Sequence, residues 1–417
     1  MKKDAAKEKK PFGERLKSFL ARPGVKSVMS SLICILGGFV VGFIVLFILS
    51  VTSEDINFVD SFKGLLIILG GPFSAGNRGD ALYQFGNMLF NCTPLIMTGL
   101  SVALAFKTGL FNIGAPGQYL MGAMGSLIVA LSIPTNVIPP ILVWLLALLT
   151  GIAFGMIWGM IPGLFKGLLG VNEVIVCIMT NWIAANIVSW VFAGSQFINV
   201  AETKMNFIKK TAANNVMTPT LGLEKLFSDG SLTSYMDISI FIAVAIAAVL
   251  YIMLNKTTFG FELKACGFNK NASKYAGMNE KRNIMLSMAI AGGLAACGAA
   301  LWCLNGHQDF KWEVYQSLPD VGFNGIPAAL LGGCNPIGTV FSAIFLRYIG
   351  AGGSNLTGQT AFNEYVSQLI IAIIIYFAGF SKFIKDVVID KWLAGRKKKQ
   401  QEALPANDKP GDGGKEV

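Results

Sequence analysis

Residues 27–51 read SVMSSLICILGGFVVGFIVLFILSV, an apolar stretch without a charged side chain. A helix needs about 20 apolar residues to cross the hydrocarbon core of a bilayer, so this stretch is long enough to span it. It also exceeds the apolar core of about 7 to 15 residues in a cleavable signal peptide, and we expect it to remain as the first transmembrane span. The stretch therefore indicates a membrane protein.

The composition of the whole chain agrees with this class. Of 417 residues, 53% are hydrophobic and only 14% are charged, whereas soluble domains carry about 25% charged residues. With the further apolar segments, the sequence predicts an all-α polytopic membrane protein with about ten transmembrane helices, some of them short or broken. The further segments are 86–106, 109–132, 138–162, 172–193, 237–254, 284–304, 323–333, 336–350 and 365–381.

The net charge of +10 is unevenly distributed along the chain. Residues 1–26 carry nine Lys and Arg residues, residues 255–283 carry six and residues 382–399 carry seven. Because Lys and Arg collect on the cytosolic side of membrane proteins, this pattern predicts that both termini are cytosolic. The orientation of the chain in the lipid bilayer thus explains the excess of Lys and Arg, and no nucleic-acid partner is needed to explain it.

The predicted organisation has three parts. Residues 1–26 form a basic cytosolic segment, residues 27–390 form a transmembrane domain, and residues 391–417 form a cytosolic tail that is basic and then disordered. Two long loops interrupt the transmembrane domain. We expect the 194–236 loop to be extracellular and the 255–283 loop to be cytosolic.

Residues 109–126, GLFNIGAPGQYLMGAMGS, combine amides, proline and glycine at the start of an expected span. Unsatisfied backbone groups are costly in hydrocarbon, and a broken helix beside a wet cavity removes that cost. Asn112 and Gln118 are therefore candidate residues of a translocation pathway. The alternative is that Asn112 caps a helix and that the glycines only pack against neighbours.

A second interrupted region, VGFNGIPAALLGGCNPIGTVFSAIF at 321–345, contains two short apolar pieces with a hinge at 332–336. Paired Gly- and Pro-interrupted segments indicate a solute path in many transporters. This makes Asn324 and Asn335 further pathway candidates. Re-entrant turns without solute contact are the alternative.

The segment GVNEVIVCIMTNWIAANI at 170–187 supplies the last two pathway candidates, Glu173 and Asn181. A carboxylate beside hydrocarbon is a functional candidate by default. In the alternative interpretation, Asn172 caps the helix and Glu173 lies in its first turn, where the helix dipole favours a negative charge. Asn181 lies deeper, and an interhelical hydrogen bond would also explain it.

Four glycines recur at every fourth position near the end of the 138–162 segment. This spacing places them close to one helix face, which predicts a helix-packing seam. They are Gly151, Gly155, Gly159 and Gly163.

No catalytic or cofactor motif stands out in the sequence. It contains no GxxxxGK followed by Ser or Thr, so we expect no cofactor in this chain and ATP hydrolysis only on a partner subunit. It also lacks GxSxG, HExxH and clustered metal ligands, which favours a transport subunit over an enzyme.

Four ordered segments resemble a known family. They are PLIMTGLSVALAFKTGLFNIGAPGQYLMGA (94–123), GVNEVIVCIMTNWIA (170–184), TTFGFELKACGFNKNASKYAGMN (257–279) and VGFNGIPAALLGGCNPIG (321–338). In this order they are similar to the ABC importer permeases for simple sugars, branched-chain amino acids and nucleosides. The resemblance is strongest to the nucleoside, guanosine-type branch of Gram-positive bacteria.

The resemblance implies a plasma-membrane permease that translocates purine nucleosides. It implies three partners: a second homologous permease, a cytosolic ABC ATPase and an extracellular substrate-binding lipoprotein. A simple-sugar ABC permease is one alternative function. An ion-coupled secondary transporter is a less favoured one, because Glu173 is its only plausible titratable group.

The resemblance also assigns the 255–283 loop as the element that couples the permease to the ATPase. By match to the family motif, the coupling residues are Gly260, Glu262, Lys264, Gly267, Asn269, Tyr275 and Gly277.

Overall fold

The computed structural model describes residues 23–52, 57–199, 207–228, 232–362, 364–384 and 387. The predicted tail 391–417 and nearly all of segment 1–26 lie outside these residues. The described part is all-helical, as predicted, with two isolated β-bridges and no strand. Its elements are α2 (Pro23–Thr52), α3 (Phe58–Gly70), η1 (Gly71–Ser74), α4 (Arg78–Lys107), α5 (Ala115–Ser132), α6 (Pro140–Leu169), α7 (Glu173–Phe192), η3 (Thr211–Asn214), α8 (Leu223–Leu226), α9 (Ser239–Lys256), α10 (Thr258–Phe268), α11 (Lys270–Tyr275), α12 (Glu280–Cys303), α13 (Asp320–Leu331), α14 (Pro336–Gln359), α15 (Glu364–Gly379) and α16 (Ser381–Ile384).

The chain divides into two compact units. Among the described residues, one unit comprises those up to Ile44 together with those from Ala372 onward, and the other comprises those between Val45 and Ile371. In the first, α2 and α15 meet closely, because a Cβ atom added at Gly38 would lie 2.7 Å from the Cα atom of Ile374. The second unit holds α3 to α14 and every site described below.

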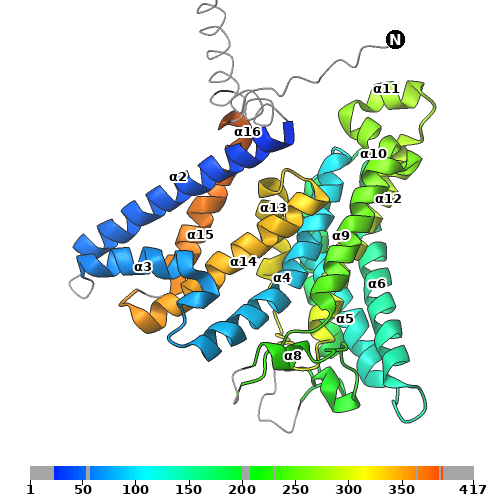
Figure 1. Cartoon of the computed structure of the whole chain (residues 1–417). Helices are drawn as coiled ribbons and strands as arrows, with labels where there is room; N and C mark the ends of the chain where they lie inside the picture. Colours follow the sequence, from blue (N-terminus) through cyan, green and yellow to red (C-terminus); the bar gives the residue numbers. More distant parts are fainter. Residues whose placement is uncertain are drawn as a thin grey trace, which may run out of the picture. The chain divides into compact units, whose positions relative to one another are not determined.

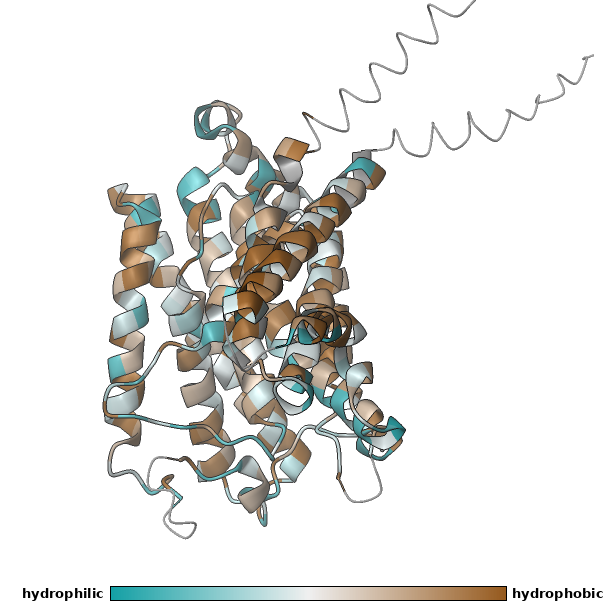
Figure 2. Ribbon diagram, turned by 90° about the vertical axis from the view of Figure 1, so that its left-hand side faces the viewer, coloured by the Kyte–Doolittle hydropathy of each residue, from teal (hydrophilic) through white to brown (hydrophobic). Residues whose placement is uncertain are grey.

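Helices α4 and α12 form the interior of the second unit. In the most apolar window of each helix, 83% of α4 and 78% of α12 is buried, against 33% of α6 and of α9. Helix α12 packs against α4, α5 and α6, and these helices can be followed in Figure 1. Figure 2 shows hydrophobic residues along the helices and hydrophilic ones concentrated in connections and helix ends. The exposed apolar faces of α6 and α9 are typical of helices in contact with lipid.

All four glycines of the predicted seam face α12, namely Gly151, Gly155, Gly159 and Gly163. A Cβ atom at Gly155 would lie 2.6 Å from the carbonyl oxygen of Gly292, and one at Gly159 would lie 2.5 Å from that of Met288. The two backbones therefore approach more closely than a side chain would allow.

Six helices among the described residues are long and apolar enough to cross a membrane, and the bent pair α13 and α14 would make a seventh. The expected count of about ten is therefore not confirmed. The predicted 109–132 span is helical only from Ala115, and residues 109–114 form the break before it. The sequence also missed α3, whose 13 residues fall short of a full span.

The predicted hinge between α13 and α14 is present, and the two helices are bent by 120°. The Oδ1 atom of Asn335 accepts hydrogen bonds from the backbone N–H groups of Ile337 at 3.0 Å and Gly338 at 3.4 Å. Asn335 is therefore the N-cap that restarts the helix. Beyond it, α14 continues past the predicted end at 350.

The two long loops lie at opposite ends of the helical bundle. Figure 1 shows α10 and α11, from the 255–283 loop, at one end and α8, from the 194–236 loop, at the other. Residues 200–206 and 229–231 of the second loop lie outside the described residues.

Candidate functional site

A buried amide network closes the break before α5. The Nδ2 atom of Asn112 donates to Ser101 Oγ at 2.9 Å and to Gln118 Oε1 at 2.8 Å. Its Oδ1 atom accepts from the backbone N–H of Gly114 at 3.1 Å. Asn112 and Gln118 are 0% and 1% exposed, so the polar groups of the break are satisfied by protein atoms.

Asn181 joins α7 to the same break. Its Oδ1 atom accepts from the backbone N–H of Gly117 at 2.9 Å, and its Nδ2 atom donates to the carbonyl oxygen of Ile113 at 3.0 Å. The structure thus brings together three of the predicted pathway residues, Asn112, Gln118 and Asn181. Their part in translocation stays a prediction.

Replacing Asn181 with leucine should lower the melting temperature of the detergent-solubilised protein. The change leaves the Gly117 N–H and the Ile113 carbonyl buried without a partner, at a cost of about 1 to 3 kcal/mol for each group. Asn186→Leu is the matched control on the same helix, because Asn186 is exposed and donates only to Trp182 O within α7. Equal melting temperatures for the two variants would contradict a stabilising role of Asn181 at the break.

Glu173 lies in the first turn of α7, where Asn172 caps the helix by accepting from the Val174 N–H at 2.9 Å. Its carboxylate forms an ion pair with Lys166 at 2.8 Å. The local geometry is that of the capping interpretation, and the charge of Glu173 is compensated. Asn324 is exposed on α13.

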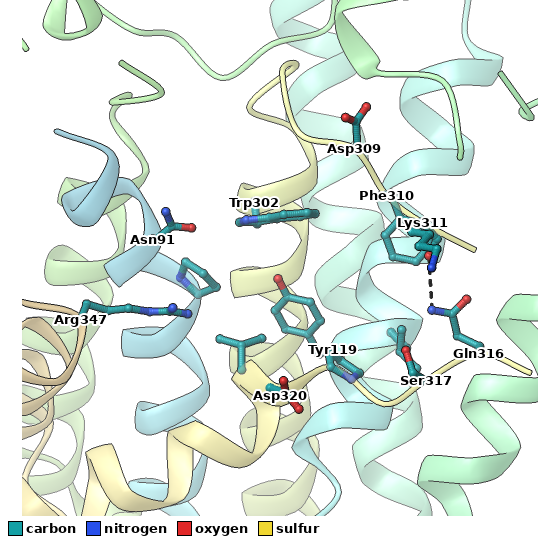
Figure 3. Close-up of a pocket in the computed structure, with 14 residues that line it drawn as sticks. Asn91, Tyr119, Trp302, Asp309, Phe310, Lys311, Gln316, Ser317, Asp320 and Arg347 are labelled. Atoms are coloured by element: carbon teal, nitrogen blue, oxygen red, sulfur yellow. Dashed lines mark hydrogen bonds between the residues drawn. The ribbon is translucent and has the colours of Figure 1, made fainter. Parts of the chain in front are cut away.

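A cavity of about 360 Å³ opens between α4, α5, α12, α13 and α14 and the segment before α13 (Figure 3). Its walls combine aromatic faces with amide and charged groups. The aromatic residues are Tyr119, Trp302 and Phe310, and the polar ones are Asn91, Asp309, Lys311, Gln316, Ser317, Asp320 and Arg347.

None of the predicted pathway residues lines this cavity, but Gln118 of the amide network directly precedes a lining residue. That residue is Tyr119 of α5, which faces the cavity. Thr98 Oγ1 donates to the carbonyl oxygen of Val321, another lining residue, at 3.0 Å and ties α4 to the start of α13. The network and the cavity thus share helix α5.

Arg347 is the functional candidate that the sequence interpretation missed. It is the only charged residue of α14, and this was the available signal. Its Nε atom is buried without a hydrogen-bond partner, and its guanidinium forms no ion pair with any described residue. An unpaired cation inside a membrane domain is costly, and such residues mark solute paths.

The predicted coupling loop contacts the break directly. Gly267 of α10 lies against the turn after α4, since a Cβ atom at Gly109 would be 3.1 Å from Gly267 Cα. A Cβ atom at Gly267 would lie 2.5 Å from the carbonyl oxygen of Lys107. Gly109 is three residues before Asn112, so the loop packs against the chain just before the amide network.

The other predicted coupling residues shape the loop itself. Glu262 accepts from Asn283 Nδ2 at 3.2 Å and so joins α10 to α12. Asn269 caps α11 through the Ala272 N–H at 3.0 Å. Tyr275 is 93% exposed and offers an aromatic side chain at the end of the bundle.

Two further residues of the set have local contacts, and a third shapes the backbone of the loop. Lys264 Nζ donates to Asn255 Oδ1 at 3.4 Å. Gly260 packs on α9, because a Cβ atom there would lie 2.6 Å from the Cα atom of Leu254. Gly277 has a positive φ of 81°, which ends α11 in a conformation that glycine adopts readily.

Residues 84–379 match the family described as the branched-chain amino acid transport system permease component. The chain belongs to this permease family. The match covers the break, the coupling loop, the cavity and the hinge. No solved structure matches the chain.

Named relatives of the permease are subunits of ABC transporters. The permease is 35% identical to the nucleoside ABC transporter permease protein NupB of Lactococcus lactis, over 88% of this chain and 94% of that protein. It is 35% identical to the guanosine ABC transporter permease protein NupP of Bacillus subtilis, over 78% and 91%. The glucose ABC transporter permease protein TsgB13 of Haloferax volcanii is 28% identical, over 72% and 78%.

These matches confirm the resemblance to ABC importer permeases. The permease is a multi-pass protein of the plasma membrane, and it is a transport component.

Proposed function

We propose that the permease translocates purine nucleosides of the guanosine type as one subunit of an ABC importer. The observation that carries this proposal is the 35% identity to both the nucleoside permease of L. lactis and the guanosine permease of B. subtilis, which extends over at least 78% of this chain. A simple sugar is the second candidate substrate, favoured by the glucose permease at 28% identity.

The proposed complex contains a second homologous permease, a cytosolic ABC ATPase and an extracellular binding lipoprotein. The proposed topology has about ten crossings of the 27–390 domain with both termini in the cytosol. In this arrangement, the basic 1–26 and 391–417 segments and the 255–283 loop face the ATPase, and the 194–236 loop faces the binding protein. The distribution of Lys and Arg supports it.

In the proposed mechanism, ATP binding on the partner displaces α10, which pushes the 107–109 turn through Gly267. The amide network of Asn112, Gln118 and Asn181 passes this movement to α5 and to the cavity. Asn324 and Asn335 border the path at α13 and at its hinge, and the Glu173 pair with Lys166 holds the α6 to α7 turn. The close contact between Gly267 and Gly109 supports this route.

Uptake by cells lacking the gene tests the substrate. We expect deletion to abolish uptake of labelled guanosine and inosine in a strain without redundant systems, and expression of the permease to restore it. Lost glucose uptake with normal guanosine uptake would instead favour the sugar alternative. Uptake that survives ATP depletion and collapses with an uncoupler would favour an ion-coupled carrier.

Replacing Tyr275 with alanine should reduce the amount of ATPase that co-purifies with the permease. Tyr275 is exposed on the proposed docking loop, and truncating an aromatic interface residue removes binding energy without disturbing the fold. Tyr315→Ala is the matched control, because Tyr315 is also exposed but lies outside the coupling loop. Equal ATPase recovery with both variants would count against the coupling assignment.

A further inference from the structure

Arg347 and Asp320 bring opposite charges to one cavity without pairing to each other or to another described residue. The other charged groups there are compensated, because Lys311 pairs with Glu313 and Asp309 pairs with Lys210. Both unpaired groups thus retain hydrogen-bonding capacity for a solute.

The cavity has the size and the walls of a site for a planar ring. Its volume of about 360 Å³ falls in the range of ligand pockets, about 300 to 1,000 Å³. Figure 3 shows the Arg347 side chain extending from α14 toward the part of the cavity that holds Tyr119 and Trp302. Aromatic faces stack with heterocyclic bases, and they do so with little regard to which base is bound.

The two charged residues would add the selectivity that stacking lacks. A guanidinium only donates, and it matches the adjacent O6 and N7 acceptors of a 6-oxopurine in a bidentate contact. A carboxylate only accepts, and it suits the N1–H of the same base. Adenine presents an amino group at position 6 and an acceptor at N1, so both contacts become unfavourable.

We propose that Arg347, with Asp320, is a specificity-determining residue that selects 6-oxopurine nucleosides over adenosine within the membrane domain. This inference rests on the proposed nucleoside transport. It adds a base-reading step in the permease, downstream of recognition by the binding protein.

The test uses the complete importer and compares ratios of uptake rates, so that selection by the binding protein cancels between permease variants. In Arg347→Met, the guanosine to adenosine ratio should fall by roughly ten- to a hundredfold, the discrimination expected of one bidentate contact. The ratio of guanosine to 7-deazaguanosine uptake should also fall in this variant, because 7-deazaguanosine lacks the N7 acceptor that the guanidinium would contact.

Two further variants keep the test decisive if the Met variant is not produced. Arg347→Lys retains the charge but loses the bidentate fork, so it should support uptake with a reduced ratio. Asp320→Asn should also lower the guanosine to adenosine ratio, because its amide no longer opposes the N1 acceptor of adenine. Unchanged guanosine to adenosine ratios in active Arg347→Lys and Asp320→Asn permeases would overturn the inference. Absence of all nucleoside uptake by the wild type would instead refute the proposed function.

Discussion

Replacing Gly267 with valine should lower solute uptake while leaving the permease in the membrane. A Cβ atom at this position would lie 2.5 Å from the carbonyl oxygen of Lys107 and 2.9 Å from the backbone nitrogen of Gly109. Because backbone atoms cannot rotate away, α10 must separate from the turn. We expect uptake to fall by roughly tenfold or more, since the movement of the ATPase would no longer reach the break.

The measurement is labelled-nucleoside uptake, normalised to the amount of permease in isolated membranes. Gly170→Asn is the control in another turn between helices, because Gly170 has a positive φ of 69° that asparagine tolerates and has open space around it. Co-purification of the ATPase should persist in Gly267→Val. Normal uptake in this variant would show that the contact does not transmit the movement.

Replacing Gly155 with leucine should prevent recovery of folded permease. A Cβ atom at Gly155 would lie 2.6 Å from the carbonyl oxygen of Gly292. Even overpacking against movable side chains costs about 1 to 3 kcal/mol, and here α6 and α12 must move apart along the whole seam. Because α12 also contacts α4 and α5, the separation would disturb the interior of the unit.

Size-exclusion chromatography of the solubilised protein measures this effect, and we expect aggregate in place of a single peak. Gly358→Leu provides the matched control, since Gly358 is a helical glycine with no atom within 4 Å of the added Cβ. A sharp peak for Gly155→Leu would mean that the seam tolerates bulk and that its glycines are not required for packing.

The amide residues show how far local sequence could be interpreted. An asparagine and a glutamine after a glycine turn correctly marked a break in the helix, because backbone groups at such a place need partners. The sequence left open whether water, a solute or protein atoms supply those partners. In the structure, Ser101 from α4 and Asn181 from α7 meet Asn112 and the break, and this meeting depends on residues distant along the chain.

The cavity was beyond local interpretation. Tyr119, Trp302 and Arg347 lie on three different helices, and no local pattern in the sequence relates them to one another. A lone arginine on such a helix could face a connection, another charge or a cavity. The packing of α14 against the rest of the unit places it in a cavity where no described residue pairs with its charge.

Hydrophobic length, interruptions by Gly and Pro, and short ordered motifs are local features of the sequence. The chain alone therefore determined its membrane class, its helical nature and the sites of its two interruptions, and its four motifs indicated the family by resemblance. Burial, close approach and shared cavities arise between distant segments. Tertiary structure therefore decided which polar residues satisfy the break, which helix packs on the glycine seam and which charged residues line the shared cavity.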